Sequence, residues 1–349
     1  MLGGQDERAL SECAATGLLP QLFDIAQSHN LLPALAVRYG EHRTGREALN
    51  GSGGELLVQA LRDNTMRNMQ ISAQALKFTR LLNRAGIVPL FLKGTAQLLT
   101  AQGKNLGFRK QVDIDLLVKP NQLAAAGEVF LADGYSFCRI PVNSTEQTVV
   151  LQETAKALKT STAHHHLPPL AKVGYAATVE LHRHFLPRRF QRNNPLRPLF
   201  SAAEKHESHS ASFLVPSPEY RIMHMIMGTL VHDGYLARYA FPVREACDYM
   251  DLIEHSGERF DYGLVARHCG KNFNTFSQLV NELMASPPAE TINGTVAISQ
   301  RLRIMQKRYN SAAVGRALDA YARAIHLANS LAHSPAKLPG YVKRLVSTG

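Results

Sequence analysis

The chain has 349 residues, of which 45% are hydrophobic, and its formal net charge is +11. This composition excludes an intrinsically disordered chain, and the length favours more than one domain. No apolar stretch approaches the roughly 18–20 uninterrupted residues that cross a membrane. The first residues also lack a basic segment followed by an apolar run, which is the pattern of a secretory signal. We therefore expect a soluble, cytoplasmic protein without membrane contact.

The cysteine positions and the net charge limit the possible protein classes and partners further. The four cysteines lie far apart and form no C-x-x-C pair, which argues against a disulfide framework or a zinc ribbon. The positive charge attracts polyanions, so nucleic acids and nucleotide phosphates are candidate partners. Many soluble proteins are equally basic without binding RNA, so the charge alone leaves the partner open.

Three zones follow one another along the chain. Residues 1–86 have apolar residues at helical spacing, and Gly86 ends the last of these helices. Residues 87–215 alternate between short apolar runs and helical patterns, with strands expected at 87–92, 112–118, 135–140 and 177–185. The helices expected between those strands lie at 95–102, 120–132 and about 144–159.

The third zone, residues 216–349, has an almost entirely helical pattern. Its helices are expected at 217–233, 242–256, 261–269, 273–285, 296–306 and 311–332. The order of elements predicts an α+β protein, with a small mixed β-sheet core and helices packed on it. N-terminal and C-terminal helical regions flank this core, which gives domains at 1–86, 87–215 and 216–349.

Asp113 and Asp115 are two residues apart on the strand predicted at 112–118. Side chains alternate along a strand, so both carboxylates point to one face while Ile114 and Leu116 point into the core. Two carboxylates on one face repel each other unless a cation lies between them, and Mg²⁺ is the natural candidate. A solvent-facing pair on a half-exposed strand is the alternative.

A glycine turn, Lys93-Gly94-Thr95, stands upstream between a predicted strand and a predicted helix. Glycine at such a turn lets backbone N–H groups approach phosphate oxygens, and the helix N-terminus favours an anion. The Thr95 hydroxyl can donate as well. The same three residues also make an ordinary helix start, so the turn alone does not establish a phosphate site.

Glu180 lies downstream and shares one face of its predicted strand with His182 and His184. A third carboxylate on a neighbouring strand would complete a metal cluster with the two aspartates. A glutamate exposed at the rim of the sheet is the alternative. For the two histidines, a structural role is the simpler interpretation.

These residues, taken in order, carry a family resemblance. The motifs are Phe91-Leu-Lys-Gly-Thr-Ala-Gln-Leu-Leu99, Arg109, Asp113-Ile-Asp115-Leu-Leu-Val, Gly134-Tyr135, His165-His166-Leu-Pro-Pro-Leu170 and Val179-Glu-Leu-His182. Over residues 85–255 the chain resembles the uncharacterised nucleotidyltransferase family of the DNA polymerase β-type superfamily. It is more distantly similar to toxin-type nucleotidyltransferases of abortive-infection and toxin–antitoxin systems. The superfamily usually has Gly-Gly or Gly-Ser where this chain has Lys93-Gly94-Thr95.

The resemblance implies transfer of a nucleoside monophosphate from an NTP, ATP among them, to a hydroxyl acceptor, with release of pyrophosphate. It implies two divalent ions, Mg²⁺ or Mn²⁺, as cofactors. The residues expected to hold the ions, and to form the catalytic set, are Asp113, Asp115 and Glu180. The residues expected at the nucleotide phosphates are Lys93, Gly94, Thr95 and Arg109.

Other polar residues are candidates for the cleft or the acceptor, namely His166, His182, His184, Arg188 and Arg189. The two arginines belong to the densest basic stretch, which can follow a phosphate backbone or form a solvated loop. The acceptor stays open between RNA such as a tRNA end, a small metabolite and a peptide. The alternative function is a non-catalytic nucleotide- or RNA-binding regulatory protein that keeps the fold. A metallohydrolase that uses the histidines is less favoured, because zinc-ligand spacing is missing.

Overall fold

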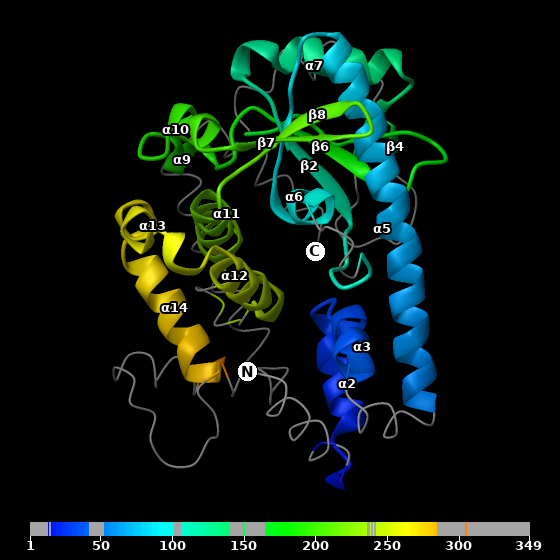
Figure 1. Cartoon of the computed structure of the whole chain (residues 1–349), viewed down its shortest axis with the longest axis vertical. Helices are drawn as coiled ribbons and strands as arrows, with labels where there is room; N and C mark the ends of the chain where they lie inside the picture. The colour runs from blue at the N-terminus through cyan, green and yellow to red at the C-terminus, as the bar shows by residue number, and fades with distance from the viewer. Residues whose placement is uncertain are drawn as a thin grey trace, which may run out of the picture. The chain divides into compact units, whose positions relative to one another are not determined.

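The computed structural model describes residues 13, 15–41, 52–100, 106–139, 149–150, 165–235, 238, 240, 242–284 and 304–305. The chain divides into two compact units, Met1–Phe185 with Leu196–Ser217 and Leu186–Pro195 with Pro218–Gly349. Within the described part of the chain, no helix has both the length and the apolar character needed to cross a membrane. Figure 1 labels the elements of both units.

The described part of the first unit contains an eight-stranded mixed sheet. Its strands are β1 (Leu90–Phe91), β2 (Asp113–Leu117), β3 (Ser136–Arg139), β4 (Val149–Val150), β5 (Leu170–Ala171), β6 (Thr178–His182), β7 (Glu204–Ser208) and β8 (Ala211–Val215). Their order in the sheet is β4-β3-β5-β6-β2-β1-β8-β7. β2 therefore lies between β6, with which it is parallel, and β1, with which it is antiparallel.

The register of β2 and β6 sets which side chains meet. Asp115 is paired with Glu180, so the two carboxylates leave the same face of the sheet side by side. The neighbouring residues on the two strands point to the opposite face. These are Ile114 on β2 and Val179 and Leu181 on β6, all fully buried in the core. The alternation predicted for both strands is confirmed.

The helices of the first unit are α2 (Leu19–Ser28), α3 (Leu32–Glu41), α5 (Ser52–Arg84), α6 (Lys93–Thr100), the 3-10 turn η1 (Pro120–Gln122), α7 (Leu123–Ala132) and α10 (Leu196–Ser201). The C-terminal end of the long helix α5 lies beside the sheet in Figure 1, and the rest of the helix extends past the sheet beside α3. Phe78 of α5 is buried, with its ring centroid 5.0 Å from that of Phe130 and 6.1 Å from that of Phe91. Burying a phenylalanine contributes about 1.5–3 kcal/mol, so this face anchors α5 to the core.

A row of polar side chains on α5 holds the segment that leads into β2. Asn68 Nδ2 donates to the carbonyls of Leu106 and Arg109 at 2.5 and 2.8 Å. Arg67 Nε donates to the Gln111 carbonyl at 3.0 Å. Because these carbonyls have no strand partner, α5 supplies their donors and fixes the approach to Asp113.

The second unit is helical over its described residues. It contains α9 (Arg188–Gln191), α11 (Pro218–His224), the π-helix η2 (Met225–His232), α12 (Val243–Ser256), the 3-10 turn η3 (Gly257–Arg259), α13 (Tyr262–Cys269) and α14 (Lys271–Met284). Asp261 caps α13, because its carboxylate accepts a 2.8 Å hydrogen bond from the Leu264 N–H. Tyr249 on α12 packs edge-on against Phe276 on α14, with ring centroids 5.3 Å apart.

Most predicted elements are confirmed, and the α+β architecture with them. The helix expected at 144–159 is wrong at Val149–Val150, which form β4, and the rest of it lies outside the described residues. The helices expected at 296–306 and 311–332 also lie outside them, apart from 304–305, which are helical. The hairpin of β7 and β8 had no counterpart in the sequence analysis. The domain boundaries at 86 and 215 stay predictions.

Candidate functional site

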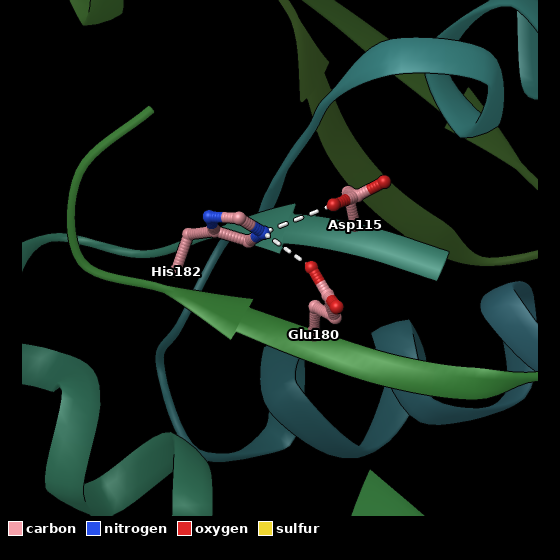
Figure 2. A group of neighbouring side chains, drawn as sticks. All are labelled: Asp115, Glu180 and His182. Atoms are coloured by element: carbon pink, nitrogen blue, oxygen red, sulfur yellow. Dashed lines mark hydrogen bonds and ion pairs between the residues drawn. The ribbon is translucent and has the colours of Figure 1, made fainter. Parts of the chain in front are cut away.

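Asp115, Glu180 and His182 form a tight group on one face of the central strands. His182 Nε2 lies 3.0 Å from Asp115 Oδ1 and 3.5 Å from Glu180 Oε2. Figure 2 shows the imidazole from β6 directed at both carboxylates. One ligand atom from each residue lies within 4.8 Å of the other two, as required of side chains that hold one metal ion.

Lys93, the first residue of α6, brings a positive charge to this group. Its Nζ lies 2.7 Å from Asp115 Oδ1, the same oxygen that His182 approaches. Lys93 has a φ of 48°, in the left-handed region that a residue with a Cβ seldom adopts. Such backbone strain of about 1–3 kcal/mol is typical of functional sites. The side chain is 42% exposed, whereas that of Asp115 is fully buried.

The charges in this group shift one another's pKa values. Burial alone would raise the pKa of Asp115, but the Lys93 ammonium and the His182 hydrogen bond outweigh it and hold that pKa below its usual range. Burial opposes the charge on Lys93 and on His182, yet the neighbouring carboxylates raise both pKa values. Asp115 is therefore ionised and Lys93 positively charged at neutral pH.

Asp113 behaves differently from Asp115 on the same strand. Burial, followed by the negative charge of Asp115, raises the pKa of Asp113 to about 6. Asp113 shares the electrostatic field of Asp115, Lys93 and Glu180 but is not in the group of mutually close ligand atoms. Its carboxylate thus carries negative charge that Lys93 compensates only in part and that an added cation would stabilise.

A buried polar atom tests whether the group fits a cation. Among the described residues, Asp115 Oδ2 has no hydrogen-bond partner, and the Asp115 side chain is fully buried. A buried charged oxygen without a partner costs at least about 1–3 kcal/mol. Carboxylate oxygens and an imidazole nitrogen are ordinary ligands of divalent cations. The residues present therefore fit a divalent metal ion.

The glycine turn is packed against the segment that precedes β2. A Cβ added to Gly94 would overlap Arg109 Nη1 and Gln111 Oε1, so only glycine leaves room for these side chains. Arg109 Nη1 donates to Gln111 Oε1 at 2.9 Å, and Gln111 Nε2 donates to Thr95 Oγ1 at 3.0 Å. This connection brings Arg109 and the turn together, and their role at the phosphates stays a prediction. Thr95 itself is fully buried, and its role at phosphates stays a prediction.

Gln111 was missed by the sequence analysis. It is 3% exposed and connects Arg109, Thr95 and the backbone carbonyl of Asp113, to which its Nε2 donates at 2.7 Å. A glutamine next to a strand has no distinctive pattern in one sequence. The only available signal was its position two residues before Asp113.

Two more histidines surround the ring of His182. The rings of His165 and His166 have centroids 5.4 and 5.2 Å from it. His166 Nδ1 lies 2.7 Å from the Leu167 carbonyl, which can only accept, so Nδ1 carries the proton there. Burial lowers the pKa of His166 and favours the neutral ring. His166 thus lies beside the group, and its role at a cleft or acceptor stays a prediction.

The remaining candidates are His184, Arg188 and Arg189. His184 is buried and stacks on Phe185, with ring centroids 5.1 Å apart. Arg188 and Arg189 lie on α9 in the second unit, where Arg189 Nη2 approaches His232 Nδ1 at 3.3 Å. The role of these three residues at the acceptor stays a prediction.

Comparison with known proteins agrees with this geometry. The model of the uncharacterised nucleotidyltransferase family matches residues 19–281, which include every residue of the Asp-Glu-His group and all of β2 and β6. No curated protein and no solved structure matched. The match covers well over half of the chain. The chain therefore belongs to the uncharacterised nucleotidyltransferase family.

Proposed function

We propose that this chain is a metal-dependent nucleotidyltransferase that moves a nucleoside monophosphate from an NTP to a hydroxyl group. The single observation that carries the proposal is the buried group of Asp115, Glu180 and His182, with Lys93 against it, in a chain of this family. Buried acids with strongly shifted pKa values beside a basic residue are typical of catalytic sites.

The chemistry follows from the transfer itself. The acceptor oxygen attacks the α-phosphorus, the bond from that phosphorus to the bridging oxygen breaks, and pyrophosphate leaves with its charge. A divalent cation held by Asp113, Asp115 and Glu180 would neutralise phosphate charge and bring the two oxygens into line. Glu180, with a side chain 21% exposed, is the carboxylate that we place to accept the acceptor's proton.

The turn Lys93-Gly94-Thr95 and its neighbours provide the part of the site that binds the NTP phosphates. We place Lys93 and Arg109 at the β- and γ-phosphates, because both carry charge next to the N-terminal residues of α6. Two features support this placement: the Lys93 side chain is partly exposed, and Arg109 packs directly over Gly94. A guanidinium can bind phosphate oxygens in pairs, which favours Arg109 as the orienting residue.

The acceptor can be identified by a direct screen. Each α-³²P-labelled NTP is incubated with Mg²⁺ or Mn²⁺ and with total RNA, a small-molecule extract or a peptide fraction. We expect label to enter one fraction with the native chain and with Glu207→Gln, whose carboxylate is exposed on β7, but not with Asp115→Asn. Transfer by Asp115→Asn at the native rate, or no transfer from any NTP, would contradict the proposal.

A second function is favoured by one contact. Because Lys93 already neutralises Asp115, the site can attract a nucleotide without a metal ion, as a regulatory nucleotide- or RNA-binding protein requires. Calorimetry in EDTA distinguishes the two functions. Tight metal-independent NTP binding without pyrophosphate release favours the binding protein, whereas metal-dependent binding with release favours the transferase.

A further inference from the structure

We infer that His182 is itself a metal ligand in this chain, which makes the cation site a mixed nitrogen–oxygen site that prefers a first-row transition-metal ion such as Mn²⁺ over Mg²⁺. The inference deepens the proposed function, since the ion concerned is the one that nucleotide transfer would use. It differs from the expectation of three carboxylates, because an imidazole joins Asp115 and Glu180 in the group of close ligand atoms.

The two strands hold the three side chains in fixed positions. Glu180 and His182 leave the same face of β6, two residues apart, and Asp115 is the neighbour of Glu180 on β2. Each pairing belongs to a parallel ladder of five residue pairs, so none of the three ligands depends on a loop. Sites built on strands hold their geometry more tightly than sites built on loops.

The distances match those between ligands of one ion. Two ligand atoms about 2.1 Å from an ion are about 3.0 Å apart at octahedral angles and about 3.4 Å apart at tetrahedral angles. His182 Nε2 lies 3.0 Å from Asp115 Oδ1 and 3.5 Å from Glu180 Oε2. Both distances are close to these values, and the ligand atoms of Asp115 and Glu180 lie within 4.8 Å of each other.

The surroundings of His182 direct its function to one nitrogen. The side chain is 1% exposed, and the rings of His165 and His166 lie against it. Every polar contact that the structure gives the ring is made by Nε2, the atom that faces the carboxylates, and Nδ1 has no partner among the described residues. Nε2 is therefore the nitrogen of His182 that is placed to bind a cation together with the two carboxylates.

The chemistry of these ligands explains the preference for Mn²⁺ over Mg²⁺. Mg²⁺ takes oxygen ligands almost exclusively and keeps much of its water, whereas imidazole favours first-row transition ions. Mn²⁺ accepts carboxylates as readily as Mg²⁺ and binds nitrogen better. A site with two carboxylates and one imidazole should bind Mn²⁺ at least about ten-fold more tightly than Mg²⁺.

The test uses the full chain without nucleotide. Mn²⁺ is titrated by electron paramagnetic resonance, Mg²⁺ is added as a competitor, and pulsed spectra are recorded with natural and with ¹⁵N-histidine-labelled protein. We expect a directly bonded ¹⁴N coupling that changes with the label, and a preference for Mn²⁺ of about ten-fold or more. Bound Mn²⁺ without a nitrogen coupling, or equal affinity for the two ions, would overturn the inference.

Two histidine variants test whether His182 supplies the nitrogen ligand. His182→Asn should lose the coupling and most of the preference, while His209→Asn, on the exposed β7–β8 turn, should keep both. A coupling that persists in folded His182→Asn would show that another histidine is the ligand and would overturn the assignment. If His182→Asn does not fold, the labelled native chain still shows whether a histidine binds the ion. His166→Asn then tests whether His166 is that histidine. Loss of the coupling in His166→Asn contradicts the assignment to His182.

Failure of this inference and failure of the proposed function give different results. Metal affinity and nitrogen coupling are measured without NTP or acceptor. A chain that binds Mn²⁺ through His182 but transfers no nucleotide supports the inference and removes the function. A chain that transfers nucleotide with an all-oxygen metal site keeps the function and removes the inference.

Discussion

The Lys93 ammonium and the Asp115 carboxylate form a 2.7 Å ion pair that joins the first residue of α6 to the middle of β2. This contact places a fixed positive charge on the carboxylate that is also the proposed metal ligand. Lys93 therefore has two opposite effects, because it competes with a cation at Asp115 and attracts the phosphates of an NTP. The two effects can be separated by experiment.

Replacing Lys93 by methionine should raise the affinity for Mn²⁺ in the absence of nucleotide by about three- to ten-fold, because a competing positive charge is removed. The same variant should lose at least about ten-fold in kcat/KM for the NTP, because a charged phosphate contact is lost. Isothermal titration and steady-state kinetics measure the two quantities. Lys205→Met, at an exposed ion pair on β7, is the matched control and should change neither. Weaker Mn²⁺ binding by Lys93→Met would contradict this account.

The raised pKa of Asp113, about 6, predicts a cost to stability in the absence of metal. Since the folded state favours the protonated acid, ionisation of Asp113 destabilises the fold above pH 6, and this cost disappears as the pH falls below 4. Asp113→Asn should therefore raise the free energy of unfolding in EDTA at pH 7.5 by about 1–3 kcal/mol, and the Tm should rise with it. Near pH 4 the substitution should have little effect on either quantity. Thermal unfolding at both pH values checks this. A lower Tm for the variant at pH 7.5 would show that the charge is already compensated.

Gly94→Ala should act through Arg109. The new Cβ overlaps the Arg109 guanidinium and Gln111 Oε1, and the guanidinium is the end of a flexible side chain that can move away. We expect the fold to survive with a loss of about 1–3 kcal/mol and the KM for NTP to rise about ten-fold. A double-mutant cycle with Arg109→Ala should be strongly non-additive, because Gly94→Ala has already displaced Arg109. Additive effects on KM would mean that the two residues act independently.

Asn68→Ala tests whether α5 positions the segment before β2. The variant leaves the Leu106 carbonyl without its side-chain donor and removes one of two donors to the Arg109 carbonyl, the other being Asn64 Nδ2. This loss should lower the free energy of unfolding by about 1–3 kcal/mol. Met69→Ala, at the next position of the same helix and 56% exposed, should change it by less than about 0.5 kcal/mol. Urea unfolding measures both. Equal stability of the two variants would remove the anchoring role.

The part of the site that could be predicted from the sequence follows from the alternation of apolar and polar residues along two strands. Alternation along β2 and β6 correctly separated Asp115 and Glu180 from Ile114 and Leu181, because each strand has one buried apolar face. The register that pairs Asp115 with Glu180 could not be predicted, since it depends on contacts between segments 65 residues apart in the chain. The expectation that the two strands are neighbours came from the third carboxylate that a metal cluster with the two aspartates would need.

Other features depend on three-dimensional contacts that leave no local pattern. His182 was expected either in a structural role or at the cleft, because spacing does not show where an imidazole points. The positive φ of Lys93 and the donors that Asn68 provides also had no signal, because each is fixed by a partner from another element. β7 was missed because its residues are mostly charged or polar, and its pairing with β8 defines it.

The most direct test of the central claim compares two positions of one label. NTP carrying ³²P at the α-phosphate or at the γ-phosphate is incubated with Mn²⁺ and the acceptor fraction found in the screen. The account expects the α-label, and not the γ-label, to enter the acceptor, with pyrophosphate released in equal amount and with no transfer by Asp115→Asn. Entry of the γ-label, or transfer of the α-label that does not require Asp115, would contradict it.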